Sequence, residues 1–219
     1  MTITLVGSPT TLDTLPAPAR RALVGAPIGQ QPLVEAALAW QRLQPVDDPS
    51  ALLSHSGYLP IAETPDEHVA TRVARLLSSL TFSAITEIGR GTAEARFRVD
   101  VPVMRHRPVT RTLAGVWRQT RRQFGPDVRV AGTDREAAIS LWRIAALIAE
   151  SEPVHHRFCF RPGKEATGAM LVTAAARLGV RATLRRLAYR PAVLIEEPDQ
   201  VRLLVTTVLQ QAPLPEQCR

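Results

Sequence analysis

The strongest constraint on the fold is a repeat, because one order of helix, strand, helix and strand occurs twice along the chain. In the first copy, residues 68–80 (HVATRVARLLSSL) predict a leading helix and residues 95–102 (ARFRVDVP) the strand after it. The second copy matches these with residues 135–147 (REAAISLWRIAAL) and 156–163 (HRFCFRPG). A further helix and a valine-containing strand follow in both. The sequence therefore predicts an α+β fold built from a duplicated unit.

The two copies differ in their expected length. The second copy continues through a strand at residues 192–197 and a closing helix at residues 199–211. The first copy is cut short after the strand expected at residues 127–131 (DVRVA). We therefore expect a duplicated unit whose first copy is shortened.

A proline-rich segment precedes the repeats. Half of the 18 prolines lie at or before Pro65, among short helical patterns at residues 17–25 and 32–43. We expect this segment to be an arm or small helical cap without chemistry of its own. The first repeat is expected to open with Thr64 as the N-cap of a helix and Pro65 at its first position. The expected division is an arm at residues 1–62, a shortened first repeat at 63–132 and a second repeat at 133–219.

Arginine alternates with apolar residues in the predicted strands. Side chains two positions apart share a face of a strand, so Phe97 and Val99 face one way and the arginines beside them the other. The outward arginines of the four strands are Arg96, Arg98, Arg129, Arg157, Arg161, Arg181 and Arg185. Like charges on neighbouring strands repel each other, and Asp100 is the main acid among these strands. Such a face favours a polyanionic partner.

The total charge agrees with such a partner without requiring it. The formal net charge is +7 and the pI is near 10.8, and Lys164 is the only lysine. A GC-rich genome accounts for arginine in place of lysine, and an arginine-rich chain places arginine on any exposed surface. Guanidinium groups also suit phosphate better than ammonium groups do. Arg118, Arg121 and Arg122, near a predicted helix end, either extend the basic surface that meets this partner or form a solvated helix face.

Three features of the second copy resemble a known family. Trp142 and Arg143 precede a helix of small residues. The strand ending at Pro162 leads into an acid-containing helix that ends in ARLGV. A Leu-Arg-Arg hairpin at residues 184–186 leads through a valine strand into the closing helix. Residues 142–208 thus resemble the second half of the LAGLIDADG-like domain in the WhiA sporulation regulators of Gram-positive bacteria.

The resemblance implies a pseudo-symmetric αββαββα repeat. Its two leading helices pack together and its strands form a saddle, which in homing endonucleases of this fold lies on double-stranded DNA. WhiA proteins also carry a C-terminal helix-turn-helix domain, whereas this sequence stops at Arg219 shortly after the closing helix. A protein partner that supplies a helix-turn-helix or regulatory function is therefore expected.

A catalytic or metal site is not expected. Endonucleases of this fold need an acid at the end of each leading helix, because two carboxylates hold the divalent metal. The second copy offers Glu150 and Glu152, but the first offers no carboxylate until Glu87. His155 and His156 are adjacent and would point to opposite faces of a strand, so they cannot easily share a metal. We expect no enzyme activity, no metal and no cofactor.

The favoured function is non-catalytic binding of double-stranded DNA in a regulatory or architectural role. The alternative is a protein-interaction module that kept the fold without DNA binding, and a metal-dependent homing-type endonuclease is a distant third. Cys159 and Cys218 make no disulfide framework, and the N-terminus shows no signal peptide. Apolar runs stay below the roughly 18 residues of a membrane span. A cytoplasmic, nucleoid-associated protein without membrane contact is expected.

Overall fold

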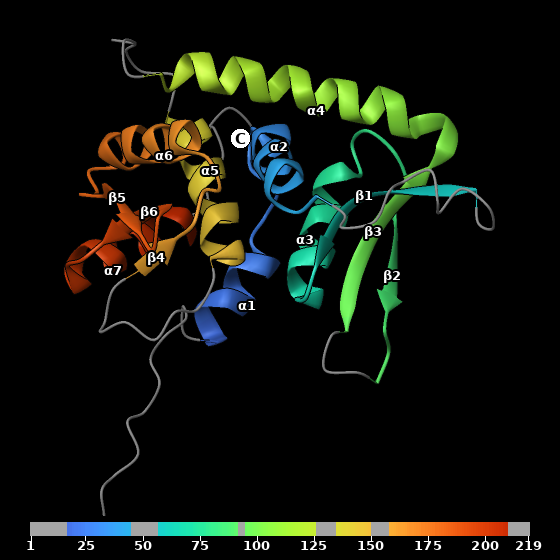
Figure 1. Cartoon of the computed structure of the whole chain (residues 1–219), viewed down its shortest axis with the longest axis horizontal. Helices are drawn as coiled ribbons and strands as arrows, with labels where there is room; N and C mark the ends of the chain where they lie inside the picture. The colour runs from blue at the N-terminus through green and yellow to red at the C-terminus, as the bar shows by residue number, and fades with distance from the viewer. Residues whose placement is uncertain (1–16, 45–56, 92–94, 126–134, 150–157, 210–219) are drawn as a thin grey trace, which may run out of the picture.

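The computed structural model describes residues 17–44, 57–91, 95–125, 135–149 and 158–209, in which helices pack between two small sheets (Figure 1). The elements in chain order are α1 (Ala17–Gly25), α2 (Pro32–Arg42), β1 (Tyr58–Thr64), α3 (Glu67–Leu77), β2 (Ala84–Ile88), β3 (Arg96–Pro102), α4 (Val103–Gln123), α5 (Arg135–Ile148), β4 (Phe158–Phe160), α6 (Glu165–Arg177), β5 (Thr183–Leu187), β6 (Arg190–Ile195) and α7 (Pro198–Leu209). No helix in this part of the chain is long and apolar enough to cross a membrane.

Two groups of elements follow one order. The first group is α2, β1, α3, β2, β3 and α4, and the second is α5, β4, α6, β5, β6 and α7. In the described residues each group holds a three-stranded antiparallel sheet with its last strand in the middle, in the orders β1-β3-β2 and β4-β6-β5. The predicted fold class, an α+β fold built from a duplicated unit, is confirmed.

The leading helix of the first copy is α2, and not the helix expected at residues 68–80. α2 packs against α5 in the middle of the molecule (Figure 1). Residues 34–39 of α2 and 137–147 of α5 are buried without interruption, as in helices that are covered on all sides. Five of the six inner residues of α2 are apolar, and the alanines among them let the two helices pack closely. The expected alignment of the two copies is therefore displaced by one helix.

This displacement removes the expected shortening of the first copy. The β2–β3 hairpin and α4 correspond to the β5–β6 hairpin and α7, so the described residues give both copies the same elements. The segment expected as an arm supplies the leading helix of the first copy. We propose that the first repeat begins at Pro32 rather than at residue 63. The strand expected at residues 127–131 lies outside the described residues.

Two helix boundaries also differ from expectation. Asp66, and not Thr64, caps α3, since its Oδ1 accepts hydrogen bonds from the backbone N–H groups of His68 at 2.8 Å and Val69 at 3.3 Å. Thr64 instead ends β1, whose pairing with β3 continues to that residue. α4 begins directly after β3, and Pro108 lies inside it.

The β5–β6 hairpin closes with a turn of two residues. Leu187 pairs with Arg190, which leaves Ala188 and Tyr189 as the turn. Both have left-handed φ angles, +48° and +65°. A two-residue hairpin turn with two left-handed residues matches the twist of the strands that it joins.

The inner faces of both sheets meet the helices in one core. Val99 and Val101 of β3 are fully buried, and Phe158 and Phe160 of β4 are at most 8% exposed. The Trp142 ring on α5 packs at a tilt against Phe158, with 5.9 Å between the ring centroids. Val99 therefore faces the core, as the alternation in its strand predicted.

Candidate nucleic-acid interface

The outer face of the first sheet carries two of the predicted arginines beside carboxylates. Arg96 Nη1 lies 3.2 Å from Glu63 Oε1, which belongs to the neighbouring strand β1. Arg98 Nε donates to Asp100 Oδ1 at 2.8 Å, and the other oxygen of Asp100 accepts from Thr86 Oγ1 at 2.8 Å. Both guanidinium groups are thus matched by an acid on the same sheet.

The second sheet repeats this arrangement with acids from neighbouring segments. Arg181 lies 2.7 Å from Glu197, and Arg185 lies 3.3 Å from Glu196, just after β6. Arg186 of β5 donates to Glu165 of α6 at 2.7 Å, and this hydrogen bond raises the pKa of Arg186.

These pairs change the expected electrostatics of the sheets. Arg161 follows β4 and is half-buried, whereas Arg129 and Arg157 lie outside the described residues. The expectation of arginine faces nearly free of acid is wrong for the described strands. The sequence pattern missed the acids because Glu63 belongs to an unpredicted strand and Glu165 to a helix.

A second basic group lies where α2 and α5 end, and sequence reasoning missed it. Arg20, Arg42 and Asp66 line a cavity of about 490 Å³ with Leu147 and Ala149, next to the last residues of both helices. Arg20 Nη2 lies 2.6 Å from Asp66 Oδ2 and also donates to the Leu147 carbonyl at 3.0 Å. We call Arg20, Arg42 and Asp66 the helix-end cluster. It holds two cations and one anion.

Arg42 connects the helix-end cluster to the second sheet. Its guanidinium carbon lies 6.0 Å from the centroid of the Phe160 ring on β4. Gly163 approaches the same guanidinium so closely that a Cβ built there would lie 2.3 Å from Nη1. Arg42 is therefore held in place by the strand and loop of the other copy.

The acids and histidines considered for a metal do not meet in the described structure. Glu87 lies on β2, where its carboxylate is 3.7 Å from Arg90 Nε and away from the helix ends. Glu150, Glu152, His155 and His156 lie outside the described residues. Within the residues that the structure describes, no three His, Cys, Asp or Glu side chains are grouped as a metal site requires.

A buried charge cluster joins three helices near the α2–α5 contact. Arg72 of α3 donates to both carboxylate oxygens of Glu35 on α2, at 2.7 and 3.1 Å. Arg143 of α5 lies 3.9 Å from the same carboxylate and donates from Nε to the Val208 carbonyl at 3.0 Å. Burial lowers the pKa of Arg143, and attraction to Glu35 offsets part of that shift.

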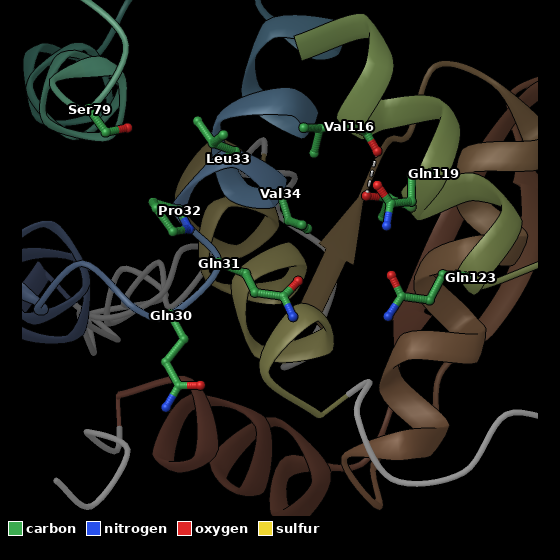
Figure 2. Close-up of a pocket in the computed structure, with 10 residues that line it drawn as sticks. Gln30, Gln31, Pro32, Leu33, Val34, Ser79, Val116, Gln119 and Gln123 are labelled. Atoms are coloured by element: carbon green, nitrogen blue, oxygen red, sulfur yellow. Dashed lines mark hydrogen bonds between the residues drawn. The ribbon is translucent and has the colours of Figure 1, made fainter. Parts of the chain in front are cut away.

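A cavity of about 310 Å³ lies at the opposite end of α2, against α4. Figure 2 shows the amides of Gln31, Gln119 and Gln123 around it, with Leu33 and Val116 on its apolar side. Each residue lining it is uncharged. Its side chains therefore suit a neutral group that both donates and accepts hydrogen bonds, and offer no cation for phosphate.

Comparisons with known proteins identify the fold. No family model and no curated protein matches the sequence. Among solved structures, full-length DUF199/WhiA from Thermatoga maritima aligns with a TM-score of 0.58 at 12% identity, over 89% of this chain and 61% of that one. The N-terminal LAGLIDADG domain of DUF199/WhiA aligns with a TM-score of 0.57 at 14% identity, over 98% of both chains. This chain thus spans about three fifths of full-length WhiA.

The homing endonuclease I-DmoI, solved in complex with DNA and Mn, is also similar. It aligns with a TM-score of 0.54 at 16% identity, over 83% of this chain and 98% of that one. At these identities the likeness establishes the fold alone. The LAGLIDADG-type fold expected from the resemblance to WhiA domains is confirmed.

Proposed function

We propose that this protein binds double-stranded DNA without cleaving it, in a regulatory or architectural role. The duplex lies along the outer faces of the two sheets and contacts their arginines through its phosphates. The fold supports this proposal, since a homing endonuclease of the same fold has been solved with DNA.

The observation that carries the proposal is the helix-end cluster. Nucleases of this fold need an acid at the end of each leading helix, but α2 ends at Arg42 with Arg20 close by. A guanidinium is always charged and cannot bind a metal cation. It does bind phosphate oxygens well, often through two parallel hydrogen bonds. The cluster therefore favours binding of a phosphate over its hydrolysis.

The ion pairs of the second sheet are compatible with this role because they lie at the surface, whereas the acids of the first sheet, Glu63 and Asp100, are largely buried. The side chains of Arg181, Arg185 and Arg186 are 75%, 55% and 72% exposed. Exposed ion pairs contribute about 0–1 kcal/mol, so their carboxylates give way to a phosphate at small cost. The pairs hold the guanidinium groups in place until DNA replaces the acids.

Fluorescence anisotropy with a labelled duplex tests the proposal. Arg181→Glu combined with Arg185→Glu is expected to weaken binding and to reduce the slope of log affinity against log salt by about 0.9 for each phosphate that is no longer neutralised. Arg202→Glu is the matched control, because Arg202 is an equally exposed arginine paired with Asp199 on α7. If the variant with Arg181→Glu and Arg185→Glu binds the duplex as tightly as the Arg202→Glu control and the unmodified protein do, binding along the sheets is refuted.

The non-catalytic part of the proposal has its own test. A supercoiled plasmid incubated with the protein and Mg²⁺ or Mn²⁺ is expected to stay intact under conditions in which the same plasmid is bound. Linear or nicked product that forms only in the presence of the divalent cation would contradict it.

Exposed apolar side chains support a protein-interaction module as the second candidate. Phe82 is 69% exposed and Met104 is 89% exposed, and both line an open hollow of about 880 Å³ with Val103. Under this alternative the protein binds neither duplex nor single strand at low salt. A Phe82→Ser and Met104→Ser variant would then lose a co-purifying partner while its thermal stability stays unchanged.

A further inference from the structure

Helix α4 differs from the rest of the surface in carrying arginines without acids. Its 21 residues include no Asp or Glu, and its arginines are Arg105, Arg107, Arg111, Arg118, Arg121 and Arg122. All six are exposed, and none of them forms an ion pair within the described residues. The sheet arginines described above are matched by carboxylates, and the other exposed cations without an ion pair in the described residues lie singly at separate elements, namely Arg21, Arg135, Lys164 and Arg190.

Five of these arginines form a single stripe along the helix. At 3.6 residues per turn they fall within an arc of about 100° around the helix axis. The buried residues Val109, Leu113, Trp117 and Thr120 lie on the other side of the helix. We call Arg107, Arg111, Arg118, Arg121 and Arg122 the basic stripe. Arg105 lies on a different face, about 150° from the middle of the stripe.

The length of the basic stripe fits duplex DNA. At 1.5 Å per residue, Arg107 and Arg122 are about 22 Å apart along the helix. The stripe has two groups, one around Arg111 and one around Arg121, whose centres are about 17 Å apart. The major groove is about 12 Å wide before the phosphates on its two sides are included. Each group can therefore contact one strand of the same duplex.

The basic stripe and the helix-end cluster lie at opposite ends of α2. The start of α2 lines the cavity against α4, whereas its last residue belongs to the helix-end cluster. Figure 1 shows α4 along one edge of the molecule, with α1 and the ends of the central helices on the other side. One duplex bound along the sheets therefore leaves the stripe exposed.

We propose that the basic stripe of α4 is a second binding surface for duplex DNA, so that one molecule holds two duplex segments. This inference rests on the proposed DNA-binding function and goes beyond it. A molecule with two phosphate-binding sides brings distant DNA segments together, so the role that follows from this inference is architectural.

A bridging assay tests the inference. One duplex is fixed on beads, and retention of a second, labelled duplex by the protein is measured. Arg111→Glu is expected to reduce retention, with a salt slope smaller by about 0.9, and Arg118→Glu combined with Arg122→Glu is expected to abolish it. Arg105→Glu is the matched control, because it makes the same charge change on the same helix outside the stripe. It is expected to retain the second duplex like the unmodified protein.

The outcomes separate this inference from the proposed function. Binding of a single duplex without retention of a second would overturn the two-surface inference and leave DNA binding intact. Retention that survives the stripe variants would also overturn it, because bridging would then come from another source such as self-association. If the unmodified protein binds no duplex at all, the proposed function itself is refuted.

Discussion

Replacing Glu35 with glutamine should destabilise the fold strongly, although the two side chains have nearly the same size. Glu35 has no exposed surface and accepts two hydrogen bonds from Arg72, which is equally buried. Arg143, 4% exposed, is the second cation near the same carboxylate. The native cluster already carries one more positive than negative charge. Glu35→Gln removes its only described anion.

The magnitude follows from this burial. Removing one partner of a buried ion pair typically costs about 3–5 kcal/mol, because the other charge stays buried without compensation. Two guanidinium groups are left here, and Arg143 Nη1 already lacks a hydrogen-bond partner in the described structure. We therefore expect a loss of about 4 kcal/mol. That is a large share of the roughly 5–15 kcal/mol by which domains are stable.

Urea unfolding followed by circular dichroism measures this loss. Glu87→Gln is the matched control, because it makes the same chemical change at an exposed acid that lies 3.7 Å from Arg90. The control should change the free energy of unfolding by less than about 0.5 kcal/mol. A loss below about 1 kcal/mol for Glu35→Gln would refute the reasoning, since it would mean that water or other groups solvate the two arginines.

Three further predictions concern local structure. Asp66→Ala should lower the free energy of unfolding by about 1–2 kcal/mol through loss of the α3 N-cap, as measured by urea unfolding. Ala188→Asn with Tyr189→Gly should raise the thermal midpoint, because Asn and Gly accept the left-handed conformation of this turn more readily. Gly168→Ala should lower the thermal midpoint, because its Cβ would lie 2.5 Å from Leu184 Cδ1; an unchanged midpoint would show that Leu184 moves aside.

The sequence predicted the helices better than the strands because their apolar periodicity extends over more residues. α5 and α6 follow their predicted ranges closely. β1 was missed because it contains Pro60 and lies within a proline-rich segment, and β2 because it is a short strand (AITEI) with little apolar alternation. Neither strand has enough local signal, and both form by pairing with β3.

The candidate site was less predictable than the fold, because its charge depends on contacts between distant segments. The partner acids Glu63 and Glu165 lie 33 and 21 residues from Arg96 and Arg186. Alternation along a strand places an arginine on a face but does not show which acid a neighbouring element brings there. The basic stripe of α4 was only partly visible in the sequence, as the cluster of Arg118, Arg121 and Arg122, because the stripe continues over the first half of a helix that already begins at Val103.

The alignment of the two copies also decides the chemistry of the helix ends. If residues 68–80 formed the leading helix, the first copy would lack the metal-binding acid only because serine and threonine follow that helix. With α2 as the leading helix, the residue at that end is Arg42. The charge has then changed sign, because the cluster holds Arg20 and Arg42 against Asp66 alone, and this net positive charge opposes the divalent cation that two carboxylates would bind. Arg20 and Arg42 instead attract the DNA phosphates, which a bound metal would help to cleave in a nuclease of this fold. An Arg42→Asp variant should therefore lose affinity for duplex DNA, because its helix-end cluster would hold two acids, at positions 42 and 66, against Arg20 alone.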